Sequence, residues 1–172
     1  MIEGMRMYGA AQHQHVYEMY QYAVQVAEEY GVTIAMETDI TLQQQIDFAD
    51  QFDGRLKYCF DTHNPVMYGT GYPPDMIRAL GKERIDHFHM KESLADEEGF
   101  ITKETAPIVL LGEGCTYFDE SVQAIKEIGY EGWIISETFY ERPRFNADGE
   151  DYVSSARKDV EKLRAAFADY NK

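Results

Sequence analysis

The chain has 172 residues, of which 44% are hydrophobic and 13% aromatic, and it carries a formal net charge of −15. This composition predicts a globular chain, and the negative charge argues against nucleic-acid binding, which depends on clustered Lys and Arg. No run approaches the roughly 20 apolar residues of a membrane span, and the first residues lack the apolar segment of a signal peptide. Cys59 and Cys115 are too few for a disulfide framework and are expected as thiols. We therefore expect a single cytoplasmic domain over residues 1–172, with no membrane or nucleic-acid partner.

Expected strands alternate with expected helices along the chain. Apolar runs predict strands at residues 2–8, 32–37, 56–61, 84–90 and 132–137, and apolar residues at three- and four-residue spacing predict helices at 16–30, 42–49, 73–80, 118–128 and 153–170. Gly31 and Gly81 are expected to end the helices before them, whereas Pro73 suits the first turn of the next. Residues 91–116 form the longest stretch without periodicity and are expected to be a functional or disordered loop. Trp133, early in the last strand, is expected to be structural.

Each of the last four expected strands ends on a side chain that can bind a metal ion. These side chains are Glu37, Asp61, His89 and Glu137, at successive intervals of 24, 28 and 48 residues. The first two intervals are about the length of one strand-helix-strand unit. In β/α barrels the catalytic groups come from the C-terminal ends of several strands. The pattern therefore predicts an α/β fold of the (β/α)8 TIM-barrel type, with a metal site at the strand ends.

The chain is short for a closed barrel. A complete eight-unit barrel usually takes about 250 residues, whereas only five strands are expected here. We therefore expect the C-terminal portion of a barrel, with about five β/α units and without the N-terminal strands. Unpaired edges of an open sheet invite pairing with another chain. We expect either a homo-oligomer that covers these edges or a partner segment that is absent from the chain.

The four predicted ligands are three carboxylates and one imidazole, which suit a divalent ion such as Mn²⁺, Mg²⁺ or Co²⁺ better than a structural zinc ion. We expect Mn²⁺ first, with Mg²⁺, Co²⁺ or Zn²⁺ as alternatives. Such an ion can bind the carbonyl and an adjacent hydroxyl group of a sugar and stabilise the enediolate formed when a carbon-bound proton is removed. Glu37 and Glu137 can then divide the proton transfer between the two faces of this intermediate. The site therefore suits isomerisation or epimerisation of a small ketose or ketose phosphate.

Simpler explanations compete with each of these residues. A glutamate at a strand end is often a solvated loop residue or half of an ion pair, so Glu37 or Glu137 alone decides nothing. Asp61 carries more weight, because an acid directly after a buried parallel strand seldom serves the core. Of His87 and His89, only one is expected to point into the mouth of the barrel.

Five segments, in order, resemble successive signatures of the xylose-isomerase-like sugar isomerase and epimerase superfamily, which are TIM barrels of the AP endonuclease family 2 type. They read Val-Thr-Ile-Ala-Met-Glu at 32–37, Tyr-Cys-Phe-Asp-Thr-His-Asn at 58–64, Ile-Asp-His-Phe-His-Met-Lys-Glu at 85–92, Leu-Gly-Glu-Gly at 111–114, and Gly-Tyr-Glu-Gly-Trp at 129–133 through Ser-Glu at 136–137. Within the superfamily, His-Met-Lys-Glu followed by a long loop into Gly-Glu-Gly-Cys is similar to ketose 3-epimerases, including those that act on L-ribulose or xylulose 5-phosphate.

The resemblance implies roles for individual residues. It places Glu37, Asp61, His89 and Glu137 at the family's four metal-ligand positions and favours His89 over His87. It also implies that Glu37 and Glu137 form the acid/base pair.

Substrate contacts are a second group of predictions. Asn64 stands three residues after the ligand aspartate, where many members of the superfamily have a substrate-binding histidine, and His63 beside it is a differently aimed substitute. Lys91, Glu92 and Arg142 are further candidates. Lys91 and Arg142 lie just beyond strand ends, where a cation could meet a hydroxyl or phosphate group, although a solvated surface charge is the simpler alternative.

Two alternatives to a sugar isomerase remain open. The superfamily includes abasic-site endonucleases with three metal ions, but residues 108–111 lack the Asp and His that would hold the extra ions, and the chain is acidic. The stronger alternative is a truncated, non-catalytic metal-binding half-barrel, or a subunit that needs a partner. The family's N-terminal strands, which supply sugar contacts, have no counterpart in the chain, so turnover of a ketose rather than metal binding would separate these readings.

Overall fold

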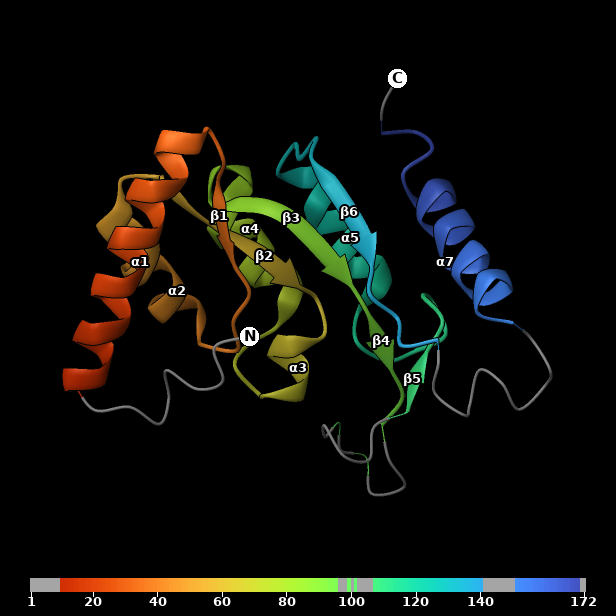
Figure 1. Cartoon of the computed structure of the whole chain (residues 1–172). Helices are drawn as coiled ribbons and strands as arrows, with labels where there is room; N and C mark the ends of the chain where they lie inside the picture. Colours follow the sequence, from red (N-terminus) through yellow and green to blue (C-terminus); the bar gives the residue numbers. More distant parts are fainter. Residues whose placement is uncertain (1–9, 96–98, 100, 102–106, 141–150, 171–172) are drawn as a thin grey trace.

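A parallel four-stranded sheet forms the centre of the computed structural model, which describes residues 10–95, 99, 101, 107–140 and 151–170. Its strands are β1 (Ile34–Met36), β2 (Leu56–Asp61), β3 (Ile85–Met90) and β6 (Trp133–Ser136). All neighbouring pairs are parallel, in the order β1-β2-β3-β6 (Figure 1). These strands confirm four of the five predicted ones to within two residues at each end, and the predicted strand at 2–8 lies outside the described residues.

Helices alternate with these strands, as a parallel sheet requires. They are α1 (Ala10–Tyr30), α2 (Leu42–Ala49), the 3-10 helix η2 (Asp50–Phe52), α3 (Asn64–Met67), α4 (Pro73–Arg84), α5 (Phe118–Glu127) and α7 (Tyr152–Ala166). Figure 1 shows α1 and α2 beside the β1 end of the sheet and α7 beside the β6 end. None of the helices among the described residues is both long and apolar enough to span a membrane.

Local sequence signals explain several helix boundaries. Thr41 caps α2 with a capping box, in which its hydroxyl accepts from the Gln44 backbone N–H and the Gln44 side chain accepts from the Thr41 N–H. Gly31 follows α1 with φ of 66°, and Gly81 interrupts α4 with φ of 68°. Both glycines occupy the left-handed region that a residue without Cβ adopts at little cost. The predicted end of the first helix at Gly31 is therefore confirmed, whereas α4 is interrupted at Gly81 and continues to Arg84.

The strands separate an apolar face from a polar face. Tyr58, Phe60 and Phe88 are buried in one cluster with apolar side chains of the helices. Because successive side chains of a strand point to opposite faces, Asp61 and His89, which directly follow the core residues Phe60 and Phe88, lie on the other face. The helices thus cover one side of the sheet, and the chemistry-bearing side chains line the inner side.

The stretch at 91–116 contains more order than its sequence pattern suggested. Two short strands, β4 (Glu92–Ser93) and β5 (Ile108–Val109), form an antiparallel pair. Two further backbone hydrogen bonds extend this pair: the Leu94 N–H donates to the Pro107 carbonyl, and the Cys115 N–H donates to the Ser93 carbonyl. The described parts of this stretch are therefore tied to the strand ends, and the expectation of a loop without strands is wrong there.

The predicted fold class is confirmed, since strands and helices alternate around a parallel sheet of TIM-barrel type. Over the described residues the sheet is open and has β1 and β6 as its outer strands. It has four strands, where the sequence pattern predicted about five units. The open sheet presents its inner face, together with the C-terminal strand ends, as the place where predicted site residues meet.

Candidate metal centre

The four predicted metal ligands converge at the C-terminal ends of the four parallel strands. Glu37 follows β1, Asp61 ends β2, His89 lies near the end of β3, and Glu137 follows β6. One ligand atom from each lies within 4.8 Å of the others. Side chains from 100 residues of sequence thereby meet at one edge of the sheet, because parallel strands bring their carboxyl ends together.

Asp61 is the most deeply buried of the four ligands. Its Oδ1 accepts hydrogen bonds from the backbone N–H groups of His63 at 2.6 Å and Asn64 at 3.1 Å. Its Oδ2 lies 3.0 Å from Lys91 Nζ. Burial raises the pKa of Asp61, and the Lys91 ammonium acts in the opposite direction. The aspartate is thus fixed in place by the turn that follows β2 and by one cation.

Glu137 is held by a cation and an imidazole. Lys91 Nζ lies 2.5 Å from Glu137 Oε2, and His89 Nδ1 lies 3.4 Å from the same oxygen. Burial alone would raise the pKa of Glu137, but hydrogen bonds from His89 and Lys91 lower it to about 2. Glu137 is therefore a carboxylate at neutral pH, which a metal ligand must be.

Lys91 is buried rather than solvated, with 4% of its surface exposed. Burial lowers its pKa, yet the neighbouring carboxylates Asp61 and Glu137 outweigh this and raise it. Its Nζ also lies 4.9 Å from the centre of the Phe139 ring, within the range of a cation–π contact. The simpler alternative of a surface charge is wrong for Lys91, whereas Arg142, predicted with it, lies outside the described residues.

His89 and His87 lie on the same face of β3, with ring centroids 5.3 Å apart. Residues two apart in a strand share a face, so the expectation that only one of them points inward is wrong. His89 Nδ1 faces Glu137 and Glu37, at 3.4 and 3.8 Å from their Oε2 atoms. The hydrogen bond with Glu137 raises the pKa of His89. The structure places His89 among the carboxylates, and His87 lies two residues further from the C-terminal end of β3.

Asn64 and His63 are buried beside the ligands. Asn64 Nδ2 donates a 3.0 Å hydrogen bond to Glu37 Oε1, which links the turn after β2 to the ligand after β1. The ring Nε2 of His63 lies 2.8 Å from Ser93 Oγ, so that histidine contacts β4. The structure therefore places Asn64 in contact with the site, and it turns His63 toward the neighbouring strand.

Glu92 accepts hydrogen bonds from the backbone of the loop that precedes α5. Its Oε2 accepts from the backbone N–H of Gly112 at 2.6 Å and of Gly114 at 3.1 Å, and its Oε1 accepts from the N–H of Thr116 at 3.3 Å. Both oxygens are thus used to hold backbone amides. This arrangement favours a part in anchoring the 112–116 loop over the predicted substrate contact.

Asp159 is a buried residue that the sequence analysis did not single out. It accepts hydrogen bonds from Ser136 Oγ at 2.9 Å and Thr138 Oγ1 at 2.6 Å, the residues on either side of Glu137. It also accepts from the backbone N–H of Leu111 at 2.8 Å. Its position on the apolar face of α7 was the available signal, since an acid on such a face needs partners when buried.

The donor set of this centre fits a divalent metal ion. The three carboxylates carry three negative charges, and Lys91 contributes one positive charge, so about two negative charges remain for a divalent ion to balance. Nδ1 of His89 points at the carboxylates, 3.4 Å from Glu137 Oε2 and 3.8 Å from Glu37 Oε2, so a ring nitrogen faces the oxygen donors with which it would share an ion. Three oxygen donors and one nitrogen donor are the ligand types of Mn²⁺, Mg²⁺ and related ions.

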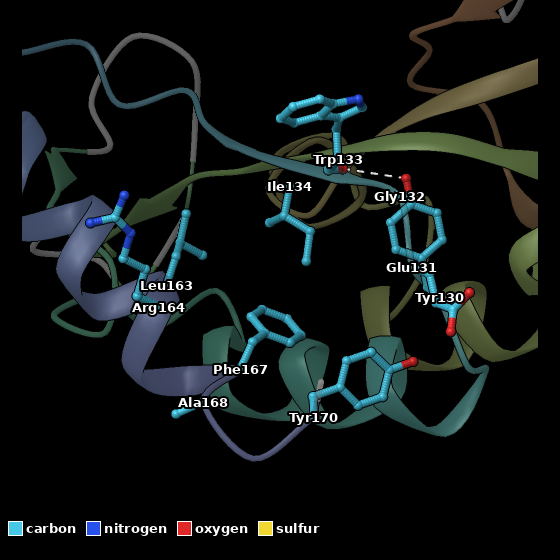
Figure 2. Close-up of a pocket in the computed structure, with 10 residues that line it drawn as sticks. All are labelled: Tyr130, Glu131, Gly132, Trp133, Ile134, Leu163, Arg164, Phe167, Ala168 and Tyr170. Carbon is cyan, nitrogen blue, oxygen red and sulfur yellow. Dashed lines mark hydrogen bonds between the residues drawn. The ribbon is translucent and has the colours of Figure 1, made fainter. Parts of the chain in front are cut away.

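A hollow lies at the opposite end of β6 from Glu137. It measures about 400 Å³ and is lined by residues 130–134, which lead into β6, by the last turn of α7 and by residues just after that helix (Figure 2). Trp133 borders it and has 79% of its surface exposed, so the expectation that Trp133 is structural is wrong. The charged side chains along its wall are Glu131 and Arg164, and none of the four predicted ligands reaches it. We therefore place the candidate site at the strand ends.

Known proteins resemble this chain over part of their length. An inosose dehydratase from Lacticaseibacillus casei is 31% identical over 113 residues, which cover 60% of this chain and 37% of the dehydratase. The crystal structure of the IOLI protein with a bound zinc atom matches with a TM-score of 0.71 at 20% identity, over 90% of this chain and 55% of that one.

D-Psicose 3-epimerase from Clostridium cellulolyticum H10, solved with D-tagatose, matches with a TM-score of 0.65 at 21% identity, over 88% of this chain and 54% of that one. The chain thus spans about a third of the dehydratase and about half of the two solved structures. At 20% and 21% identity, the similarity to these two solved structures shows a shared fold. A family model described as xylose isomerase-like TIM barrel matches residues 4–166, and the chain belongs to this family.

Proposed function

We propose that this chain supplies the metal site of a divalent-metal-dependent isomerase or epimerase of a small ketose or ketose phosphate. The observation that carries the proposal is the convergence of Glu37, Asp61, His89 and Glu137 within 4.8 Å at the strand ends. Two of these four are glutamates, the residue type that can both bind an ion and move a proton. Membership in a family with sugar-modifying relatives supports the same reading.

A bound divalent ion would polarise the substrate carbonyl and lower the cost of charge on its oxygen. We propose that the four residues named above hold this ion and that Mn²⁺ is preferred. Asp61 is fixed by two backbone N–H groups, so it would keep its position whether or not an ion is bound. Asn64 donates a hydrogen bond to Glu37, and Lys91 forms ion pairs with Asp61 and Glu137, so both residues would hold the ligands in position.

Glu37 and Glu137 would perform the proton transfers. One carboxylate takes the proton from the carbon next to the carbonyl, and the other returns it on the opposite face of the planar enediolate. Their Oε2 atoms lie 3.8 and 3.4 Å from His89 Nδ1. Asn64 orients Glu37 by donating to its Oε1, and Lys91 keeps Glu137 ionised.

We propose that Lys91 contacts a substrate oxygen. Its ammonium already lies between two carboxylates, so a substrate oxyanion formed there would meet a positive charge in a site sheltered from water. Arg142 remains a second proposal for a hydroxyl or phosphate group. We assign His63 and Glu92 to the support of the strand ends, because Ser93 and the 112–116 loop are their partners.

Dehydration of a hydroxy-ketone is a second candidate reaction, favoured by the 31% identity to inosose dehydratase. Removal of the same proton is followed there by loss of a hydroxyl group from the neighbouring carbon instead of return of the proton. Both reactions therefore need the same base and the same stabilised oxyanion. They differ in their product.

Proton–deuterium exchange measured by NMR in D₂O tests the proposal. Free and phosphorylated ketoses and a cyclic hydroxy-ketone are incubated with the Mn²⁺-loaded protein. We expect exchange at the carbon next to the carbonyl, with loss of at least about 100-fold in Glu137→Gln, the scale of a removed general base. Glu131→Gln is the matched control, because Glu131 is exposed on the same segment.

The products distinguish the epimerase hypothesis from the dehydratase hypothesis. A new stereoisomer supports the epimerase, and an unsaturated or dicarbonyl product supports the dehydratase. Absence of exchange from a folded chain that binds Mn²⁺ would contradict catalysis by this chain and would favour the non-catalytic metal-binding half-barrel, or a subunit that needs a partner. Size-exclusion chromatography with light scattering of the same sample tests the predicted homo-oligomer.

A further inference from the structure

A second group of potential ligands lies on the inner face of the sheet, one layer below the carboxylates. Cys59 on β2 and His87 on β3 are register partners across the two parallel strands. One ligand atom each from Cys59, His87 and His89 lies within 4.8 Å of the others. Only His89 is shared with the carboxylate site. This group has two members that the proposed sugar chemistry does not use.

The ligand types of the two groups differ. A thiolate with two imidazoles is the set that thiophilic ions of the zinc class prefer, whereas the carboxylate-rich set suits Mn²⁺ and Mg²⁺. Three protein ligands leave the fourth tetrahedral position of a zinc-class ion open. A zinc-class ion would therefore prefer the group that contains the thiolate, and Mn²⁺ or Mg²⁺ would prefer the neighbouring carboxylates.

The orientation of His87 is an independent observation in favour of a metal. Its Nδ1 lies 2.8 Å from Asp86 Oδ2. Histidines that bind metal ions commonly donate the other ring N–H to a carboxylate, which fixes the tautomer and makes the ring a better ligand. The Asp86 contact thus leaves Nε2 as the metal-binding nitrogen of His87.

We propose that Cys59, His87 and His89 form a second metal site, selective for thiophilic ions such as Zn²⁺ and distinct from the carboxylate site. Cys59 is 5% exposed, so the ion would be enclosed by the sheet rather than held at the surface. Its burial also separates it from the exposed Cys115. The proposal does not rest on the sugar reaction, since Cys59 and His87 take no part in the proposed proton transfer and only His89 is shared with the carboxylate site.

Cobalt spectroscopy tests this site. Co²⁺ bound to a thiolate gives a sulfur-to-metal charge-transfer band that oxygen and nitrogen ligands do not give. We expect this band in the wild type and in Cys115→Ser, its disappearance in Cys59→Ser, and its displacement by Zn²⁺. His87→Gln should weaken Co²⁺ binding at least about tenfold, and Asp86→Asn about 10- to 100-fold, the range for the partners of ligand histidines.

Two further measurements keep the test decisive. Mn²⁺ binding to Cys59→Ser, followed by electron paramagnetic resonance, should remain and thereby shows that the variant is folded with its carboxylate site intact. If Cys59→Ser does not fold, X-ray absorption of zinc-loaded Cys115→Ser should show one sulfur at about 2.3 Å. Absence of that sulfur, or a charge-transfer band that depends on Cys115, would overturn the proposal.

Discussion

The charge of Lys91 balances two carboxylates within the candidate site. Its Nζ lies 3.0 Å from Asp61 Oδ2 and 2.5 Å from Glu137 Oε2, and the lysine and the aspartate are both buried. Two carboxylates without a nearby cation would repel each other in such a place, since a buried charge is stable only when it is paired. Lys91 therefore connects the stability of the fold to the electrostatics of the proposed metal ligands.

We predict that Lys91→Met destabilises the metal-free chain by about 3–5 kcal/mol, the cost of breaking a buried ion pair. The substitution keeps the length of the side chain but leaves Asp61 buried without its cation. Urea unfolding followed by circular dichroism measures the change.

Lys82→Met is the matched control, because Lys82 is exposed. A divalent ion should recover part of the lost stability, since it replaces the missing positive charge. Equal stability of Lys91→Met and Lys82→Met would show that the Lys91 pair contributes nothing to folding.

Among the secondary-structure elements, α2 depends on a cap that is visible in the sequence. Thr41 precedes the helix, and Gln44 stands at its third position, where the two residues exchange hydrogen bonds. The segment between Glu37 and Thr41 links the ligand to the helix, so the start of α2 also limits how far Glu37 can move. Local chemistry at a helix end thereby supports a functional side chain.

Thr41→Ala should lower the free energy of unfolding by about 0.5–2 kcal/mol, because it removes the oxygen that accepts from the Gln44 N–H. The measurement is the midpoint of a urea transition at constant slope. Thr41→Ser retains the hydroxyl group and should behave like the wild type. A loss in the serine variant equal to that in the alanine variant would assign the effect to something other than the cap.

At the scale of the whole molecule, Asp159 joins three segments that are distant in sequence. It lies on α7 and accepts hydrogen bonds from the end of β6 and from Leu111 in the loop before α5. A fourth bond comes from Tyr140 Oη at 2.7 Å. Ser136 and Thr138, two of these donors, flank Glu137, so the packing of the last helix sets the position of a proposed metal ligand.

We predict that Asp159→Asn costs about 1–3 kcal/mol of stability, since an amide cannot accept all four bonds and a buried donor is left unpaired. Mn²⁺ affinity should fall as well, because Glu137 loses its fixed position. Thermal unfolding with and without Mn²⁺, together with calorimetric titration, measures both effects. Glu161→Gln, exposed on the same helix, is the control, and an unchanged Mn²⁺ affinity in Asp159→Asn would refute the positioning role.

The residues of the candidate metal centre were accessible from the sequence because each stands at the end of an apolar run. In a parallel sheet the position of a residue along its strand fixes the edge at which it lies, so Glu37, Asp61, His89 and Glu137 could be grouped without coordinates. Alternation of strands and helices likewise predicted the fold class. These features are local, and periodicity and spacing report local structure directly.

Tertiary structure decided the partners of the buried polar side chains. Lys91 could have been a solvated charge, and only the packing of β3 against β2 and β6 placed it between carboxylates. Glu92 and Asp159 accept hydrogen bonds from donors 19 to 48 residues away in sequence, and Cys59 lies beside His87 through strand register. A single side chain does not encode these contacts, because they exist only once separate elements have packed together.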